Sequence, residues 1–142
     1  MRLTMFLFAF LIFIDQATKH IVRLCQLADG GFYLCNRGIA FGFEVHPILF
    51  WIIWLAIIAI VGIQIFNFKF SSFNQFSINK FTNFKFLGLI FILSGAFSNI
   101  LDRLYAGCIT DFIDLKFWPV FNLADCFIVI GAILIILNVL KK

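Results

Sequence analysis

The chain has 142 residues, of which 63% are hydrophobic and only 13% are charged, and its mean hydropathy is +1.08. A soluble domain is nearer half apolar and a quarter charged, so this composition excludes an ordinary soluble protein and predicts an integral membrane protein. The net charge of +4 would permit a nucleic-acid surface, but the placement of the charges described below excludes one.

The first apolar run, residues 3–22, has the length of about 20 residues that a helix needs to cross the hydrocarbon core. No small-x-small cleavage site follows it, so we expect a span rather than a signal peptide. Asp15 and Lys19 lie in its outer part, four residues apart on one helix face, with the acid first. They form either a structural ion pair or part of a nearby site, and the sequence favours neither.

The segment from Arg23 to His46 is not a span. Asp29-Gly30-Gly31 is a turn signal, and it predicts short strands over residues 24–28 and 32–35. Three further apolar runs follow, at 47–66, 85–104 and 121–140. We therefore predict one all-α membrane domain, residues 1–142, with four transmembrane helices and a small β-rich extracytoplasmic segment between the first two.

The four cysteines, at 25, 35, 108 and 126, form no Cys-x-x-Cys pair, and the two histidines lie far apart, so we expect no metal site. We interpret the cysteines as small buried hydrophobic residues. Cys25 and Cys35 flank one loop and could pair if that loop lies in an oxidising compartment.

The charges divide between the two membrane faces. With four spans, the side that holds both termini carries six bases and no acids, and the other side carries five bases and all seven acids. The positive-inside rule makes the basic side cytoplasmic. We therefore expect the acids, and any site that they form, at the extracytoplasmic face.

Polar residues concentrate in the stretch 95–125. The third run carries a polar stripe on one helix face, and Asn122 and Asp125 have the spacing of a helix cap. Capping alone could account for Asp125, but it leaves the neighbouring acids unexplained. No His-Glu-x-x-His or Gly-x-Ser-x-Gly motif occurs, so carboxylate chemistry remains. Asp111 and Asp125 are the best candidates for two carboxylates that share one proton.

Four motifs together resemble the lipoprotein signal peptidase (signal peptidase II) family of membrane aspartic peptidases. They are Asp15-Gln16-Ala17-Thr18-Lys19, the run 36–42 (Asn-Arg-Gly-Ile-Ala-Phe-Gly), the run 95–113 with its Ser98-Asn99 and Asp102-Arg103 pairs, and Phe121-Asn122-Leu123-Ala124-Asp125. Two departures are that Ile39 replaces a small residue and that the chain is short for the family.

The resemblance implies a catalytic pair and a set of supporting residues. The pair is Asp111 and Asp125. The supporting or substrate-binding residues are Asp15, Lys19, Asn36, Asn99, Arg103 and Asn122. It also implies cleavage of diacylglyceryl-modified prolipoproteins immediately before the lipidated Cys. We expect membrane lipid around the bundle, no cofactor, no metal, no nucleic-acid partner and a monomer in the bacterial cytoplasmic (inner) membrane.

Two other classes of function compete with a peptidase. Intramembrane Asp15, Lys19, Asp102 and Arg103 could form a proton or ion pathway, and polar helix contacts could serve a small assembly protein. A transporter usually needs polar groups through the full depth of the membrane. The inner half of each run is nearly bare of them, apart from Gln64 and Asn138. This distribution favours a site near one surface.

Overall fold

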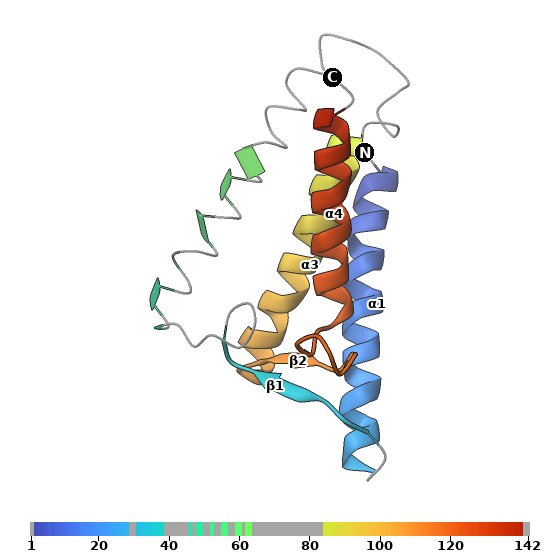
Figure 1. Ribbon diagram of the computed structural model, residues 1–142, viewed down its shortest axis with the longest axis vertical. Coiled ribbons are helices and arrows are strands. Elements are labelled where there is room, and N and C mark those ends of the chain that lie inside the picture. Colours follow the sequence, from blue (N-terminus) through green and yellow to red (C-terminus); the bar gives the residue numbers. More distant parts are fainter. Residues whose placement is uncertain are drawn as a thin grey trace.

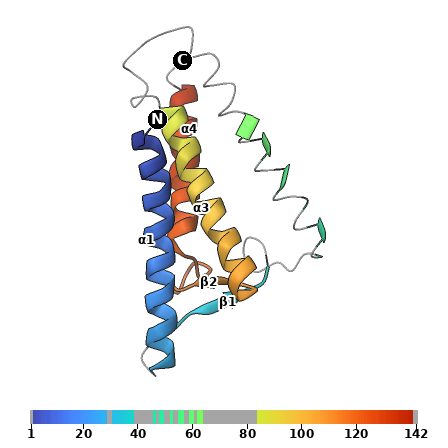
Figure 2. The same cartoon turned by 180° about the vertical axis from the view of Figure 1, so that it is seen from behind.

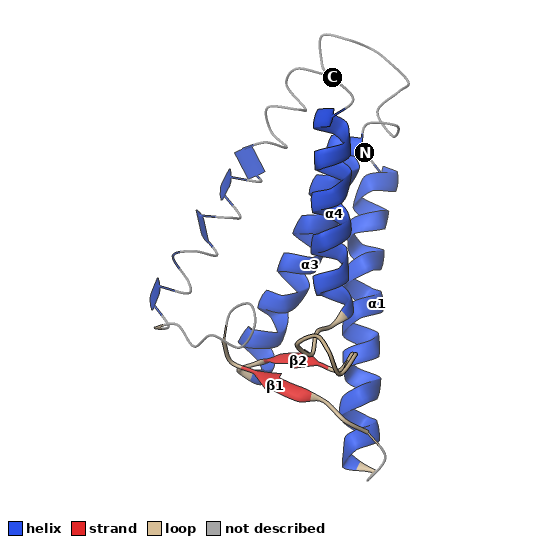
Figure 3. Ribbon diagram, viewed as in Figure 1, coloured by secondary structure: helices blue, strands red, loops and turns tan. Residues whose placement is uncertain are grey.

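The structure of the protein is a computed structural model. It describes residues 2–28, 31–38, 46, 48–49, 52, 55–56, 59–60, 62–63 and 84–140. Within these residues three long helices pack side by side, with a two-stranded sheet at one end (Figures 1 and 3). All three helices are long and apolar enough to cross a membrane. The fold is therefore mostly helical, as predicted.

Helix α1 spans Arg2–Leu27, which is longer at its C-terminal end than the predicted run 3–22. Residues 24–27 are helical rather than extended, so the strand predicted over 24–28 is wrong. The reason is that the helix formers Leu24, Gln26 and Leu27 continue the α1 pattern as far as the Asp29-Gly30 turn signal.

Strand β1, Leu34–Asn36, overlaps the second predicted strand, but its partner is distant in sequence. It pairs antiparallel with β2, Ile109–Asp111, in the register Leu34 with Asp111 and Asn36 with Ile109. The small β segment is thus built by two connectors, the one after α1 and the one after α3. Figure 2 shows β1 running from the lower part of α1 toward the end of α3.

Helix α3 spans Phe84–Ala106, close to the predicted run 85–104. It ends where Gly107 adopts a φ of 74° and donates from its backbone nitrogen to the Arg103 carbonyl at 3.1 Å. A glycine in this left-handed conformation is a common helix terminator. The chain then enters β2 directly, which places Asp111 just beyond the end of the span.

Helix α4 spans Leu123–Leu140 and packs closely against α3. A Cβ atom added at Gly95 would overlap the Ala124 carbonyl, and one added at Gly88 would lie 2.5 Å from the Gly131 carbonyl. Small residues let membrane helices approach to this degree. The contact at Gly95 fixes the first turn of α4 against the polar stripe of α3.

The predicted run 47–66 lies largely outside the described residues, and the connector 67–83 lies wholly outside them. Those residues of the run that are described, such as Ile52 and Ile60, are helical.

The prediction for the cysteines needs correction. Cys35 forms a disulfide with Cys108, 73 residues away, and Cys25 is free. Cys35 therefore does not pair with Cys25. The pairing of β1 with β2 brings Cys35 beside the turn that precedes β2, whereas Cys25 lies on α1.

Candidate active site

Asp111 closes β2 and is almost completely buried, with 2% of its surface exposed. Both of its carboxylate oxygens accept hydrogen bonds from side-chain amides. Asn122 donates to Oδ1 at 2.6 Å and Asn36 donates to Oδ2 at 2.9 Å. A buried carboxylate needs such partners, because water no longer solvates it.

A short reversal of the chain brings Asn122 beside Asp111. After β2 the backbone forms an isolated bridge between Ile113 and Phe121, with hydrogen bonds of 2.8 and 3.1 Å between them. This bridge returns the chain to the end of β2 just before α4 begins. Residues 111 and 122 therefore meet although ten residues separate them.

Asn122 and Asp125 cap the start of α4 reciprocally. The Asp125 backbone nitrogen donates to Asn122 Oδ1 at 3.0 Å, and the Asn122 backbone nitrogen donates to Asp125 Oδ2 at 3.2 Å. This is the capping box in an Asn/Asp form. The predicted cap is thus present. Because the Asn122 amide also reaches Asp111, one residue links the two carboxylates.

Asn99, on the polar stripe of α3, connects Asp125 to α1. Its Nδ2 donates to Asp125 Oδ1 at 2.9 Å, and its Oδ1 accepts from Lys19 Nζ at 2.9 Å and from Asn122 Nδ2 at 3.3 Å. The amide is therefore fixed in orientation by charged groups on both sides.

A buried ion cluster lies behind Asn99. The Lys19 ammonium pairs with Asp15 at 2.7 Å and with Asp102 at 2.9 Å, and all three side chains are fully buried. Arg23 pairs with the other oxygen of Asp102 at 3.0 Å. Two acids and two bases offset one another here, which is how a low-dielectric interior tolerates charge. Asp15 also accepts from the Ala124 backbone nitrogen at 2.8 Å, so the cluster holds the first turn of α4.

Arg103 lies on α3, one helical turn after Asn99. Its guanidinium donates to the Gly38 carbonyl, and the Gly38 backbone nitrogen donates to Asn36 Oδ1 at 2.9 Å. Arg103 thereby holds the turn that follows β1. The remainder of that motif, residues 39–42, lies outside the described residues.

The electrostatics at Asp111 favour a retained proton. Its pKa is raised from 3.8 to about 6, chiefly because burial disfavours the charged form. Donation from Asn36 opposes the rise, the nearby charge of Asp125 adds to it, and Asn122 and Lys19 oppose it. A carboxyl of this kind is poised to exchange a proton near neutral pH.

The eight predicted site residues form one connected hydrogen-bonded network. Asp111, Asp125, Asn122, Asn99, Lys19, Asp15 and Asn36 are joined by direct contacts, and Arg103 joins through Gly38. The sequence prediction put Asp102 on the polar stripe but not in the site. It also missed four polar partners of the network as site residues, Gln16, Arg23, Ser98 and Thr110.

A sequence signal existed for one of the missed residues. Arg23 continues the Asp15–Lys19 spacing by one more helical turn, so all three share one helix face. Thr110 carried no comparable signal. Its contact with Arg23 Nε, at 2.8 Å, depends on β2 lying against α1. Within the described ranges, no group of three or more His, Cys, Asp or Glu side chains could hold a metal ion.

The fold and the site together define a class: a helical membrane protein with a linked pair of carboxylates at one end of its spans, the arrangement that aspartic peptidases use. The family model described as signal peptidase (SPase) II matches residues 7–141, nearly the whole chain. The chain therefore belongs to the signal peptidase II family and is a membrane protease.

Curated relatives agree with this assignment. The lipoprotein signal peptidase of Caldanaerobacter subterraneus subsp. tengcongensis is 37% identical, over 89% of this chain and 88% of its own length. That of Syntrophomonas wolfei is 39% identical, over 81% and 72%. A bacterial membrane enzyme solved by the in meso method at 2.3 Å is 25% identical, with a TM-score of 0.72, and the match covers 99% of this chain and 89% of that one. The relatives do not favour the ion-pathway alternative.

Proposed function

We propose that this protein is an aspartic endopeptidase that removes the signal peptide from diacylglyceryl-modified prolipoproteins, with Asp111 and Asp125 as its catalytic pair. The observation that carries the proposal is that Asn122 contacts both carboxylates. Its side-chain amide donates to Asp111, and it exchanges two hydrogen bonds with Asp125 at the start of α4. The names of the curated relatives support the substrate class.

The two carboxylates share one proton, because neighbouring like charges in a buried site do not both ionise easily. The ionised member takes a proton from a water molecule, which attacks the scissile carbonyl. The protonated member donates a hydrogen bond to the carbonyl oxygen and later supplies a proton to the leaving amine. Because coupled groups titrate as a pair, the resting proton belongs to the pair rather than to one Asp.

The surrounding residues have positioning roles in this mechanism. Asn36 and Asn99 each donate to one carboxylate of the pair, and Asn122 donates to Asp111. Asp15 and Lys19 hold α1 against the start of α4. Arg103, which donates to the Gly38 carbonyl after β1, contacts the substrate backbone in the proposed mechanism.

The proposal includes a four-span topology with the site outside the cytoplasm. Strands β1 and β2 follow α1 and α3, and they pair with each other, so α1 and α3 end on the same side of the bundle. The chain between them must return across the same thickness, and the apolar run 47–66 has the required length. The protein then lies in the bacterial inner membrane as a monomer, with both termini cytoplasmic and cleavage falling just before the lipidated Cys.

The direct test is incubation of the purified protein with a lipidated prolipoprotein, following release of the signal peptide. Asp111→Asn and Asp125→Asn should each abolish release while folded protein remains, and the double variant should be little worse, because residues acting as a unit are not additive. Asp114→Asn is the matched control, since Asp114 is paired with the exposed Lys116 and should leave turnover unchanged. Near-normal turnover by either site variant refutes the pair.

The topology has its own test. Single cysteines placed at Asp29 and at Ser72 in a Cys-free variant should differ in labelling by an impermeant maleimide on intact cells. Position 29 should label and position 72 should not. Labelling of position 72 from outside contradicts the orientation.

A further inference from the structure

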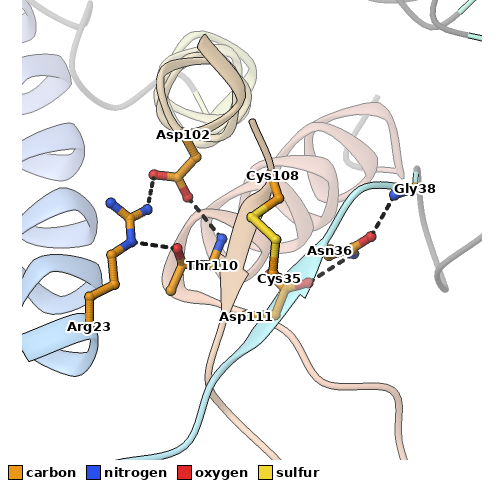
Figure 4. Close-up of a disulfide and its surroundings, with 8 residues drawn as sticks. All are labelled: Arg23, Cys35, Asn36, Gly38, Asp102, Cys108, Thr110 and Asp111. Atoms are coloured by element: carbon orange, nitrogen blue, oxygen red, sulfur yellow. Dashed lines mark hydrogen bonds and ion pairs between the residues drawn. A yellow bond between two sulfur atoms is a disulfide. The ribbon is translucent and has the colours of Figure 1, made fainter. Parts of the chain in front are cut away.

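The Cys35–Cys108 disulfide joins the two strands that carry Asn36 and Asp111. Cys35 lies within β1, one residue before Asn36, and Cys108 directly precedes β2 (Figure 4). The cross-link therefore lies beside the hydrogen bond from the Asn36 amide to the Asp111 carboxylate.

The two strands are held very differently apart from this bond. Strand β2 is buried, and its Thr110 is bound by Asp102 through the backbone nitrogen at 3.2 Å and by Arg23 through the hydroxyl at 2.8 Å. Strand β1 has three residues, two of them exposed. Two short strands are marginal on their own, and closing a long loop between them costs entropy.

Strand β1 brings one group to the reaction centre. The Asn36 amide is oriented by two contacts, since its Oδ1 accepts from the Gly38 backbone nitrogen at 2.9 Å and its Nδ2 donates to Asp111 Oδ2 at 2.9 Å (Figure 4). If β1 moves away from β2, Asp111 loses one of its two amide donors, although β2 itself stays anchored to α1 and α3.

We propose that the Cys35–Cys108 disulfide is a positioning element of the active site, which keeps the Asn36 amide on the Asp111 carboxylate so that full activity requires the oxidised chain. The inference rests on the proposed role of Asp111. It also fits the proposed topology, because disulfides persist on the extracytoplasmic side of a bacterial membrane.

The switch is a two-electron thiol–disulfide exchange. A small dithiol, such as dithiothreitol, attacks one sulfur of the bond and releases the other cysteine as a thiolate, and its second thiolate then attacks the mixed disulfide and releases the second cysteine thiolate. The dithiol is oxidised to its cyclic disulfide, and Cys35 and Cys108 are reduced to two thiols that take up its two protons. Exchange with a dithiol of the compartment would impose the same reduction, and exchange with a protein disulfide of the compartment, which is itself reduced to a dithiol, would reverse it.

The main experiment compares turnover of lipidated prolipoprotein with and without dithiothreitol for three forms of the full chain. These are the wild type, Cys35→Ser/Cys108→Ser, and the matched control Cys25→Ser/Cys126→Ser, which removes the two free cysteines. Reduction should lower kcat of the wild type and of the control about tenfold, the effect of losing a hydrogen bond to a charged group, with KM little changed. The Cys35→Ser/Cys108→Ser variant should have the lowered kcat without dithiothreitol, and dithiothreitol should not change it further.

A second readout separates positioning from loss of stability. The charged groups that act on Asp111 are Asp125 on α4, Lys19 on α1 and Arg103 on α3, and all of them lie on helices rather than on β1. Donation from Asn36 favours the ionised carboxylate, so its loss should move the pH–rate profile upward by about one unit. In an Asn36→Ala background, reduction should add little to either effect, because both changes remove the same contact.

Several outcomes overturn the inference. Reduction that lowers the melting temperature but leaves kcat and the pH profile unchanged would make the bond purely structural. Four free thiols in the untreated protein would show that the bond does not form. Failure of the proposed function would be seen separately, as turnover by Asp111→Asn with the disulfide intact. If Cys35→Ser/Cys108→Ser does not accumulate, reduction of the folded wild type still decides the question.

Discussion

Asn122 Nδ2 lies 2.6 Å from Asp111 Oδ1, so the residue that caps α4 also holds the carboxylate that ends β2. The same side chain accepts from the Asp125 backbone nitrogen through its oxygen. The Asn122 amide thus caps the helix with its oxygen and contacts the proposed catalytic carboxylate with its nitrogen. A shift of the first turn of α4 would therefore strain the contact with Asp111 and change the distance between the Asp111 and Asp125 carboxylates.

Substitutions of Asn122 should separate these two roles. Serine also caps helices well, so Asn122→Ser should keep the stabilisation that the cap supplies, but it has no amide to donate to Asp111 and should lose about 10- to 100-fold in kcat. Asn122→Ala loses the cap as well and should be about 1 kcal/mol less stable than Asn122→Ser. Thermal unfolding and signal-peptide release measure the two effects. Normal kcat in Asn122→Ser would show that the 2.6 Å contact is not used in catalysis.

The buried cluster should be structural in its effect. Lys19→Met leaves the Asp15 and Asp102 carboxylates buried without their shared cation, at a cost of about 3–5 kcal/mol, so it should deplete folded protein from the membrane. Asp15→Asn keeps the shape of the side chain and an acceptor for Ala124, so we expect only a partial loss of activity or protein level.

The matched control for the cluster is Lys116→Met. Lys116 forms an ion pair with Asp114, but its side chain is 86% exposed, and this variant should unfold like the wild type. The protein level in the membrane and thermal unfolding in detergent, measured for Lys19→Met, Asp15→Asn and Lys116→Met, test these expectations. Activity that vanishes in Asp15→Asn at normal expression, yet survives in Asp111→Asn, would reverse the assignment of roles.

The contact between α3 and α4 should matter most near the site. Gly95→Ala drives a methyl group into the Ala124 carbonyl, which belongs to the first turn of α4, so it should cost about 1–3 kcal/mol and also lower kcat. Gly88→Ala meets Gly131 and Ile135 further along the same two helices, so it should lower stability while the folded fraction keeps its kcat. Equal losses of kcat in the two variants, corrected for folded protein, would argue against this local effect.

The sequence predicted what depends on local pattern. Apolar length located α3 and α4 to within two residues at each end, and the spacing of Asn122 and Asp125 predicted the cap that forms. The i, i+4 spacing of Asp15 and Lys19 put them on one helix face and left open whether they form an ion pair or part of a site; they form the ion pair, and the structure adds Asp102 as a second acid on the same ammonium. Each of these follows from residues close together in the chain.

What the sequence did not predict depends on contacts between distant segments. Strand β1 was expected beside a local partner at residues 24–28, but its partner is β2, and the disulfide of Cys35 follows from that pairing. Arg23 and Thr110 meet only because β2 lies against α1. No local periodicity encodes such a pairing, and the resemblance to a family carried no information on these particular side chains.

The raised pKa of Asp111 should make stability depend on pH in a defined direction. Its folded-state pKa of about 6 exceeds the ordinary value of 3.8, so between these values the folded chain binds more protons than the unfolded chain. Unfolding therefore becomes easier as the pH rises through this window. The contribution of Asp111 is fully favourable below about pH 3.8 and is lost above about pH 6, a change on the order of 3 kcal/mol.

Asp111→Asn removes this titration, so the variant should be less stable relative to the wild type at pH 4 than at pH 7. The measurement is the difference in thermal unfolding between the two proteins across that range, in one detergent. Asp114→Asn is the control, because the hydrogen bonds from Lys116 lower the pKa of Asp114 below its ordinary value of 3.8, so its contribution is lost only as the pH falls below that value and should stay nearly constant from pH 4 to pH 7. A difference between Asp111→Asn and the wild type that stays constant from pH 4 to pH 7 would mean that Asp111 is fully ionised in the folded protein. Asp125 alone would then have to hold the proton of the pair at neutral pH, and Asp111 could act only as the base.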